Sequence, residues 1–406
     1  MSFQQGLSGL NAAAKNLDVI GNNVANANTV GFKSSSAEFS DVYANTLAGG
    51  GTQIGIGTAL TTVAQQFTQG NINVTNSPLD LAINGQGFFR MDVNGAVSYT
   101  RNGQFSQDKD GYIVNSTGAF LTGYAASPTG VLATAAPGKL QISTAPINPQ
   151  PTTQAAVVAN LDARSSALPA AGFVITDPST YHNATSLSVF DSQGNAHSLS
   201  LYFTKTAANT WSVFGAGDGT QIGAGALGTL AFQTDGSIDT AASTFPSTVN
   251  VPVTTGAATP IAVQLDFTGS TQFGDSFGVS KVTQDGFTSG RLAGFSVSGD
   301  GTILARYSNG QSRAQGQVAL ATFNNPNGLQ PLGNNLLAET AASGQALVGA
   351  PGSANLGVLQ SGAVEDSNVD LTAELVDMIT AQRVYQANAQ SIKTQDAVLQ
   401  TLVNLR

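Results

Sequence analysis

Residues 17–34 read LDVIGNNVANANTVGFKS, and this stretch changes from an amphipathic helical pattern into a run of asparagines. Asn22, Asn23 and Asn26 are poor residues for a helix interior, because their amides compete for backbone hydrogen-bond partners. The stretch therefore predicts that an N-terminal helix breaks between Asn22 and Lys33. A short helix of this kind has little stability alone, so it is expected to need a partner.

A possible partner for this helix lies at the other end of the chain. Apolar or small residues near the N-terminus alternate in spacings of four and three, which is typical of a coiled-coil seam. The same alternation runs more strongly along 371–403, where Asp370 is the expected N-cap. Matching seams predict that the two helices pair, although separate packing on local cores is the alternative. The apolar seam positions are Phe3, Leu7, Leu10, Leu17, Val24, Leu371, Leu375, Met378, Tyr385, Ile392, Leu399 and Val403.

Between the two helices the patterns are typical of β-strands. Short runs rich in Phe, Tyr, Val and Ile are separated by Asn-Gly or Asp-Gly pairs that suit type I′ hairpin turns. These pairs are Asn84-Gly85, Asn94-Gly95, Asn102-Gly103 and Asp110-Gly111. Strands do not alternate with helices, which argues against a parallel sheet. The expected fold is mainly β, with antiparallel β domains and a coiled-coil-like pair of terminal helices.

The composition limits the classes of partner. Charged residues make up 10% of the 406 residues, whereas a typical soluble domain has about 25%. A surface this poor in charge fits either extensive contact with other chains or a glycine-rich extracellular β protein. The net charge of −9 argues against binding to nucleic acid or to anionic membranes, which attract clustered Lys and Arg. The absence of cysteine excludes disulfides and thiolate chemistry.

Targeting signals are also missing from the sequence. The N-terminal residues have no basic region followed by an apolar run, so a cleaved secretory signal is not predicted. Apolar runs of the length of a transmembrane helix do not occur. The chain is therefore expected to be either cytosolic or exported by a route that cleaves no signal.

A search for catalytic and metal-binding patterns yields no candidate. His182 and His197 have no second histidine or acidic ligand at metal-binding spacing, and both are interpreted as surface or strand residues. Residues 108–111 resemble the start of a calcium loop but lack its terminal glutamate, so they predict a hairpin turn. The glycine-rich runs 49–57 and 215–228 lack the lysine of a phosphate-binding loop. No cofactor, metal or enzymatic activity is predicted.

Three segments together resemble the bacterial flagellar rod-and-hook family. They are the N-terminal stretch 17–34, the aromatic and turn-rich run around GFFRMD…SYTRNGQFSQDKDGYIVNSTGAFLTGY, and the tail SNVDLTAELVDMITAQRVYQANAQSIKTQDAVLQTLVNLR. The resemblance covers roughly 1–145 and 285–406. Within the family, the chain length and the inserted region 146–284 are similar to the hook proteins. Distal rod proteins, the nearest alternative, are shorter and lack this insertion.

The resemblance implies a structural subunit that polymerises into the flagellar hook, a curved flexible tube that transmits torque as a universal joint. It implies that the chain is extracellular and passes through the type III export apparatus without a cleaved signal. The implied partners are further copies of the chain, the distal rod protein, the hook cap protein and the hook–filament junction protein. An adhesin with a helical stalk is the alternative from another class, and saturable sugar binding would favour it.

The resemblance also implies four parts and two sets of assembly residues. The expected parts are an inner helical domain (1–30 with 366–406), a connecting segment (31–70 with 345–365), a middle β domain (71–145 with 285–344) and an inserted outer β domain (146–284). The seam positions given above resemble the self-assembly surface of the inner tube. The residues that resemble the inner-domain junction are Asn22, Asn23, Asn26, Gly31, Phe32 and Lys33.

Overall fold

The chain folds into two compact units. The computed structural model describes residues 2–42, 55–133 and 136–404. Unit 1 comprises 1–144, 294–306 and 312–406, and unit 2 comprises 145–293 and 307–311. Unit 1 therefore contains both ends of the chain, and unit 2 is an insertion into it. The expected division into four parts remains a prediction.

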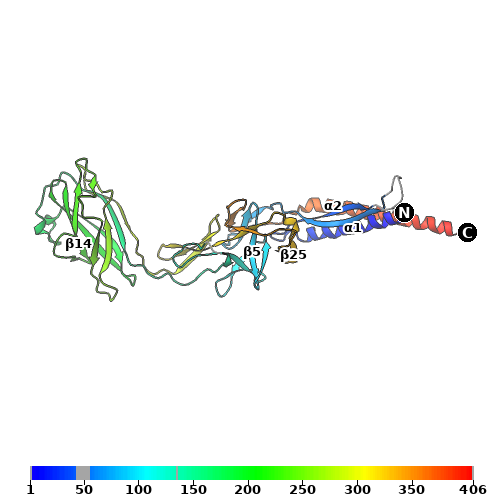
Figure 1. Cartoon of the computed structure of the whole chain (residues 1–406), viewed down its shortest axis with the longest axis horizontal. Coiled ribbons are helices and arrows are strands. Elements are labelled where there is room, and N and C mark those ends of the chain that lie inside the picture. Colours follow the sequence, from blue (N-terminus) through cyan, green and yellow to red (C-terminus); the bar gives the residue numbers. More distant parts are fainter. Residues whose placement is uncertain (1, 43–54, 134–135, 405–406) are drawn as a thin grey trace. The chain divides into compact units, whose positions relative to one another are not determined.

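The two long helices of unit 1 are α1 (Ser2–Ala25) and α2 (Leu371–Asn404), and they lie side by side (Figure 1). The Asp370 carboxylate accepts hydrogen bonds from the backbone N–H groups of Thr372 and Ala373, at 2.8 and 3.1 Å. This N-cap satisfies two of the unpaired donors in the first turn of α2. The predicted pairing of the terminal helices is confirmed.

The end of α1 differs from the prediction. Asn22 and Asn23 belong to its last turns, so the break starts at Asn26 rather than at Asn22. The Asn26 side chain donates to the backbone oxygen of Asn22 at 3.0 Å. Asn23 does not disrupt the helix because its amide finds its partners outside α1. Tertiary contacts thus outweigh the low helix propensity of asparagine.

A two-stranded antiparallel ribbon accompanies α1 (Figure 1). It consists of β1 (Ser35–Val42) and β2 (Gly57–Gln65), and the register pairs Ser35 with Gln65 and Asp41 with Thr58. Most of its side chains are exposed on both faces. Residues 43–54, which include part of the glycine-rich run 49–57 and of the expected connecting segment, lie outside the described residues.

The main sheet of unit 1 joins segments from both halves of the chain. In the described residues it has 13 strands, and its principal order is β21-β22-β23-β9-β5-β6-β26-β25. The strands of this order are β21 (Leu292–Val297), β22 (Thr302–Tyr307), β23 (Ser312–Val318), β9 (Phe120–Ala125), β5 (Phe88–Val93), β6 (Ala96–Thr100), β26 (Leu336–Ala338) and β25 (Gln330–Gly333). The others are β7 (Phe105–Gln107), β8 (Ile113–Asn115), β10 (Gly138–Lys139), β24 (Leu320–Thr322) and β27 (Leu347–Gly349).

Two short strand pairs connect this sheet region with the start of α2. β4 (Leu81–Asn84) pairs antiparallel with β28 (Val358–Ser361), and β3 (Ile72–Val74) pairs antiparallel with β29 (Ala363–Glu365). The neighbouring core buries Phe89, Met91 and Leu121 completely. A second apolar cluster surrounds Phe88. Strands close to the N-terminus are therefore fixed by strands close to the C-terminus.

Unit 2 contains two sheets around one core. One has the order β18-β19-β11-β20 and the other β12-β13-β14-β16-β17, with β15 beside β14. The strands are β11 (Gln154–Asn160), β12 (Asn183–Phe190), β13 (Ala196–Ala207), β14 (Thr210–Gly217), β15 (Thr220–Gln221), β16 (Gly228–Phe232), β17 (Ile238–Asp239), β18 (Ser247–Val251), β19 (Ile261–Asp266) and β20 (Gly278–Gln284). Short 3₁₀ turns are Ala170–Gly172 and Pro178–Thr180, and a third, Pro326–Gly328, lies in unit 1.

The core of unit 2 follows from alternation along its strands. In β19 every second side chain is buried, and Trp211 in β14 is fully enclosed. This period of two places one face of each strand toward the core. β11 and β19 pair in parallel, which departs from the purely antiparallel expectation. The linker between them in sequence contains most of unit 2, and its length makes a parallel crossover possible.

The predicted turns are only partly of the expected type. Asn94 and Gly95 both have positive φ, of 53° and 89°, and join β5 to β6 through a two-residue loop. Of the other three pairs, Gly85 and Gly111 alone adopt positive φ. Type I′ geometry is needed only where two residues connect directly adjacent strands, so the predicted turn type is wrong for the other pairs. The hairpin turn predicted at 108–111 is confirmed, because this segment joins the antiparallel strands β7 and β8.

Candidate functional site

The contact face of α1 consists mainly of small residues. A Cβ atom added at Gly6 would lie 3.1 Å from Cγ1 of Ile392, and one added at Gly9 would lie 2.9 Å from Oδ1 of Asn388. Ala13 follows one turn later and is buried. Small side chains let the two helix backbones approach closely. The pair is therefore held by close packing in which small residues of α1 lie against larger side chains of α2 such as Ile392.

Several predicted seam positions lie on neighbouring, solvent-exposed faces of the helices. Phe3 is 46% exposed and Leu375 is 48% exposed, which is unusual for large apolar residues. The exposed seam residues are Phe3, Leu7, Leu371, Leu375, Tyr385 and Leu399, whereas Leu10, Leu17, Val24, Met378 and Ile392 are half-buried. The side chain of Val403 lies outside the described part of the structure. The contact within one chain thus leaves much of the predicted seam free.

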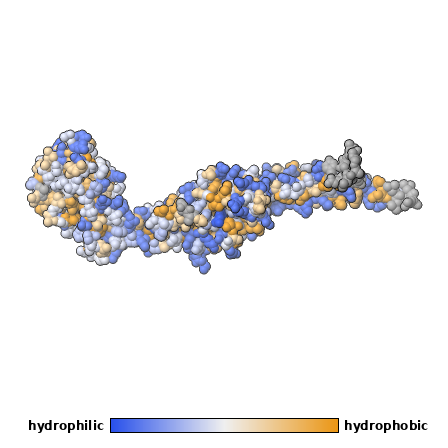
Figure 2. Space-filling model, viewed as in Figure 1, coloured by the Kyte–Doolittle hydropathy of each residue, from blue (hydrophilic) through white to orange (hydrophobic). Residues whose placement is uncertain are grey.

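Further apolar residues widen this exposed strip on α2. Four more apolar residues of α2 that do not belong to the predicted seam are also exposed, namely Val376, Ile379, Val384 and Val398. Figure 2 shows hydrophobic patches on the surface of the part that contains α1 and α2. A monomeric soluble protein rarely exposes contiguous apolar surface of this kind, so the strip is suited to contact another chain.

Asn23 is the polar link between the helix pair and the ribbon. Its side chain is buried, and its Nδ2 donates to the backbone oxygen of Ser35 at 2.8 Å and to Oε1 of Glu374 at 2.9 Å. Its Oδ1 accepts from the backbone N–H of Ser35 at 2.9 Å. Burial raises the pKa of the Glu374 carboxyl above its usual value, and the hydrogen bond from Asn23 opposes this. Asn23 therefore fixes the register of α1, α2 and β1 at one point.

Gly31 makes the turn after α1 possible. Its φ is +70°, and a Cβ atom there would lie 2.5 Å from the backbone nitrogen of Asn102. Its N–H donates to the backbone oxygen of Glu365 at 2.8 Å. Only glycine combines this conformation with such a close backbone approach. Phe32 follows as a half-buried residue with its N–H bonded to the oxygen of Thr29 at 3.1 Å.

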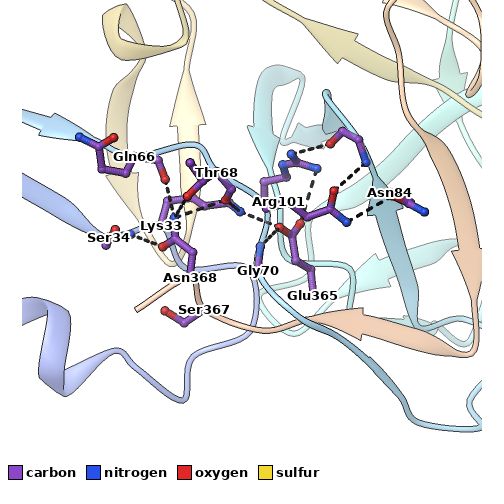
Figure 3. A network of polar contacts seen from close by, with 12 residues as sticks. Lys33, Ser34, Gln66, Thr68, Gly70, Asn84, Arg101, Glu365, Ser367 and Asn368 are labelled. Carbon is purple, nitrogen blue, oxygen red and sulfur yellow. Dashed lines mark hydrogen bonds and ion pairs between the residues drawn. The ribbon is translucent and has the colours of Figure 1, made fainter. Parts of the chain in front are cut away.

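Lys33 leads into a buried ionic network (Figure 3). Its Nζ lies 2.6 Å from Oε1 of Glu365 and 2.6 Å from the backbone oxygen of Thr68. Nη1 of Arg101 lies 3.5 Å from Oε2 of Glu365, and its Nη2 donates to the oxygen of Gly85 at 2.8 Å. All three charged side chains are at most 5% exposed. The network joins the ends of α1 and β29 to the main sheet.

Asn368 extends this network toward α2. Its Oδ1 accepts from the backbone N–H of Ser34 at 2.7 Å, and its Nδ2 donates to the oxygen of Gln66 at 2.7 Å (Figure 3). The backbone N–H of Gly70 donates to Oε1 of Glu365 at 2.9 Å. The residues before α2 are thus fixed to the residues that follow α1 and β2.

Burial determines the electrostatics of the network. It lowers the pKa of the Lys33 ammonium and of the Arg101 guanidinium below their usual values, while Glu365 opposes both shifts. Two cations share one buried carboxylate. Removal of that carboxylate would leave two uncompensated charges in a low-dielectric site, and such losses are strongly destabilising.

The junction residues predicted from the sequence fall into two groups. Asn23, Gly31 and Lys33 lie in the polar network around the helix ends, whereas Asn22 and Asn26 bond mainly to each other. Arg101, Glu365 and Asn368 also belong to this network and were not predicted from the sequence. Charged residues are scarce in this chain, so a charged residue next to a strand rich in apolar residues is a candidate for a buried ion pair.

The two histidines have defined partners in unit 2. His197 is a buried residue of β13, as the interpretation as a surface or strand residue allows, with Nδ1 2.7 Å from Oδ2 of Asp218 and Nε2 3.2 Å from Oδ2 of Asp191. Nδ1 of His182 accepts from the backbone N–H of Lys205 at 3.2 Å. Among the described residues, no group of three or more His, Cys, Asp or Glu is arranged to hold a metal ion.

Membrane insertion through a helix has no candidate in the described part of the chain. None of the helices there combines the length and the hydropathy that a membrane span needs.

Four family models match parts of the chain, one after another along the sequence. A model described as flagella basal body rod protein matches 3–33, and the flagellar hook protein FlgE/F/G D1 domain matches 82–163. The flagellar basal body protein FlaE D2 domain matches 160–287, and the flagellar basal body rod FlgEFG protein C-terminal model matches 360–405. The first and last matches contain most of α1 and α2.

Several relatives match this chain over its full length. The flagellar hook protein FlgE of Salmonella typhimurium strain LT2 is 42% identical over 416 residues, which cover 100% of both chains. The protein of the same name from Borreliella burgdorferi is 32% identical over 452 residues, covering 100% of this chain and 99% of that one. The crystal structure of Helicobacter pylori flagellar hook protein FlgE2 is similar with a TM-score of 0.56 at 14% identity, over 71% of this chain and 99% of that chain.

Proposed function

Because this chain belongs to the flagellar hook protein family, we propose that it is a structural subunit of a bacterial flagellar hook. The family is structural and is not a family of enzymes. Copies of the chain polymerise into a curved, flexible tube. This tube acts as a universal joint that passes torque from the rod to the filament.

One observation carries the proposal at the level of residues, namely the apolar strip that α2 leaves exposed. Leu375, Val376 and Ile379 are each about half exposed although α2 is paired with α1. Burial of the half of such a side chain that is still exposed contributes roughly 1 kcal/mol, so a stable contact between copies needs many of these residues together. The exposed seam residues Phe3, Leu7, Leu371, Tyr385 and Leu399 belong to the same self-assembly surface in this proposal.

Unit 2 supplies the flexible part of the proposed tube. Its surface is poor in charge, as is the whole chain, so few ion pairs would have to break when neighbouring copies slide past each other. The four-part division of the chain, with an outer domain at 146–284, is part of the same proposal. Deletion of 146–284 is expected to leave a polymer with altered curvature, whereas a hook of normal curvature would contradict the sliding mechanism.

The other partners follow from the place of the hook in the flagellum. The chain is proposed to contact the distal rod protein, the hook cap protein and the hook–filament junction protein. It is proposed to leave the cell through the type III export apparatus without loss of an N-terminal signal, and to function outside the cell.

A charge placed in the apolar strip tests the self-assembly surface. Leu375→Glu is expected to prevent polymer formation in sedimentation and negative-stain microscopy, because a buried unpaired carboxylate is costly. Far-UV circular dichroism of the monomer should stay unchanged, since Leu375 is exposed within one chain. Gln386→Glu, which adds the same charge at an exposed polar position of α2, is the matched control and should still polymerise. A Leu375→Glu protein that forms tubes at the wild-type concentration would refute this surface.

A further inference from the structure

Three loops of unit 2 meet at the buried side chain of His197. This residue lies near the start of β13, and its side chain is 5% exposed. Its Nδ1 lies 2.7 Å from Oδ2 of Asp218, in the turn between β14 and β15. Its Nε2 lies 3.2 Å from Oδ2 of Asp191, in the turn between β12 and β13. Thr255, in the loop after β18, donates to the same Oδ2 of Asp191 at 2.8 Å. The imidazole ring therefore links two turns, and Asp191 links it to the third loop.

Only the protonated ring can make both of its contacts. A neutral imidazole has one N–H group, whereas an imidazolium has two. Each ring nitrogen of His197 faces a carboxylate oxygen, and an ionised carboxylate accepts hydrogen bonds but donates none. Burial alone lowers the pKa of His197, but the hydrogen bonds to Asp218 and Asp191 raise that pKa above its usual value. The arrangement of the three side chains is therefore that of a charged histidine.

The two carboxylates differ in how firmly the protein holds them. Asp191 is fully buried, and it also accepts from the backbone N–H and the side-chain amide of Asn195, at 2.9 and 3.0 Å. Burial would raise the pKa of Asp191, but the hydrogen bonds from Asn195 and Thr255 hold it well below its usual value. The side chain of Asp218 is 51% exposed, and its second oxygen accepts from the backbone N–H of Ser198 at 2.9 Å. Asp191 therefore stays in place without the ring, whereas Asp218 can turn toward water.

Loss of the proton from the ring acts on the β14–β15 turn. As the pH rises through the raised pKa of His197, one ring nitrogen becomes a lone pair that faces a carboxylate. This repulsion is most costly beside the buried Asp191, where water does not screen it. The remaining proton is therefore expected on Nε2, and Asp218 loses its donor. Asp218 has a φ of 47°, which costs free energy for a residue other than glycine, so its contact with the ring helps to hold the turn.

No other charge takes part in this arrangement. The segments that contact the ring or its two carboxylates are 191–195, 217–222 and 252–260. They contain no charged residue besides Asp191 and Asp218. The other charge on β13, Lys205, lies eight residues from His197 at the opposite end of the strand. The state of the turn therefore depends on the protonation of His197.

We propose that His197 is a pH-sensitive latch of unit 2. The protonated ring holds the β14–β15 turn against the start of β13 through Asp218. The neutral ring keeps its contact with Asp191 and releases the turn, while the rest of the unit stays folded. Residues 218–220 are exposed, so the latch gives this part of the surface two shapes between which the pH selects. The latch lies within one chain and does not depend on polymerisation.

Hydrogen exchange of the full-length monomer, measured by mass spectrometry from pH 5 to pH 9, tests the latch. After correction for the chemical exchange rate, protection of peptides that contain Ser198 or 218–221 should fall about tenfold toward pH 9, because one charge-assisted hydrogen bond is lost. The turn at Asp235 and Gly236 is the control within unit 2, since Asp235 accepts from Ser237 and contacts no histidine among the described residues. Its protection should stay constant. Equal changes at the two turns, or no change at either, would overturn the proposal.

Asp218→Asn distinguishes a latch from a purely structural contact. The new amide can donate to the lone pair on Nδ1 of the neutral ring, and asparagine tolerates the left-handed conformation. The turn of this variant should therefore stay protected at pH 9, where the wild-type turn opens. A variant turn that opens as in the wild type would show that the proton on His197 is not the cause.

Nitrogen-15 NMR of the histidine rings gives a second measurement, because the chain contains only two histidines. His182→Gln assigns their signals. His197 should carry two ring protons at low pH and one proton, on Nε2, at high pH. A neutral ring that keeps its proton on Nδ1 would mean that Asp218 is not the released partner, and it would overturn the latch.

Discussion

Nζ of Lys33 lies 2.6 Å from Oε1 of Glu365, although 332 positions separate the two residues in the sequence. Lys33 follows the end of α1, and Glu365 ends β29 shortly before α2. Their contact holds together the roots of the two terminal helices. Arg101 brings the main sheet into the same buried network.

Glu365→Gln should destabilise unit 1 strongly, by about 3–5 kcal/mol, because it leaves Lys33 and Arg101 without their buried counter-charge. Denaturant unfolding of the monomer, followed by the helical far-UV signal, measures the effect. The single tryptophan, Trp211, lies in unit 2, so its fluorescence reports the other unit separately. Glu38→Gln is the exposed control and should change stability by less than about 0.5 kcal/mol. Equal stabilities of the two variants would show that the network contributes nothing.

Gly31→Ala should destabilise unit 1 by about 2–3 kcal/mol, because it combines a strained positive φ with a backbone clash. Gly95→Ala separates the two effects, since Gly95 also has positive φ but a Cβ atom added there would meet no atom within 4 Å. The control should therefore cost only about 1 kcal/mol. Urea unfolding curves of both variants give the comparison, and a smaller loss for Gly31→Ala would contradict the close approach to Asn102.

Gly21→Ala should stabilise the monomer by about 1 kcal/mol. Gly21 lies inside α1, and an added Cβ atom would meet no atom within 4 Å. Alanine is favoured over glycine by about this amount in a helix interior. Thermal unfolding at a concentration too low for polymerisation measures the gain. A loss of stability would mean that the α1 backbone at this point is not a regular helix.

The stability of unit 2 should be greatest between about pH 4 and pH 6.5. Burial alone lowers the pKa of His197, but its hydrogen bonds to Asp218 and Asp191 raise that pKa above the usual value. The stabilisation from protonated His197 is present below about pH 6.5 and disappears as the pH rises through the raised pKa. The hydrogen bond from His197 lowers the pKa of Asp218, so the stabilisation from its carboxylate is present above about pH 4 and disappears as the pH falls.

Trp211 fluorescence during urea unfolding at several pH values measures this dependence. His197→Asn should remove the decline on the alkaline side, because the titrating imidazole is then absent. A wild-type stability that rises steadily from pH 6 to pH 8 would contradict the coupling of His197 to the two aspartates.

Local patterns in the sequence were sufficient to predict the two terminal helices and most of the strands. The four-three spacing marked both terminal helices, and alternation marked strands such as β13 and β19. Which face of α2 meets α1 could not be predicted, because apolar residues at adjacent positions, such as Leu375 and Val376, give two overlapping strips. The strip that faces α1 is determined by the small residues of α1 that lie opposite it. These residues can be identified only once the pairing of the two helices is known.

Contacts between distant segments were beyond prediction from one sequence. The partners of Lys33 and His197 follow from strand pairing, and no local pattern encodes that Asp218 lies beside His197. Arg101 directly follows β6 and Glu365 ends β29, and nothing in the sequence around either residue reveals that they meet. The parallel pairing of β11 and β19 was missed for the same reason.

The network of Lys33, Arg101 and Glu365 also sets an order of events during folding. Its members come from the beginning, the first third and the end of the chain, so it is among the contacts with the longest loops to close. A chain that emerges gradually from either end cannot complete this network until nearly all of it has been delivered. In a partial chain, the ends of α1 and α2 next to the network are therefore not yet joined. Only a complete subunit forms the fixed helix pair that presents an ordered surface to the next copy.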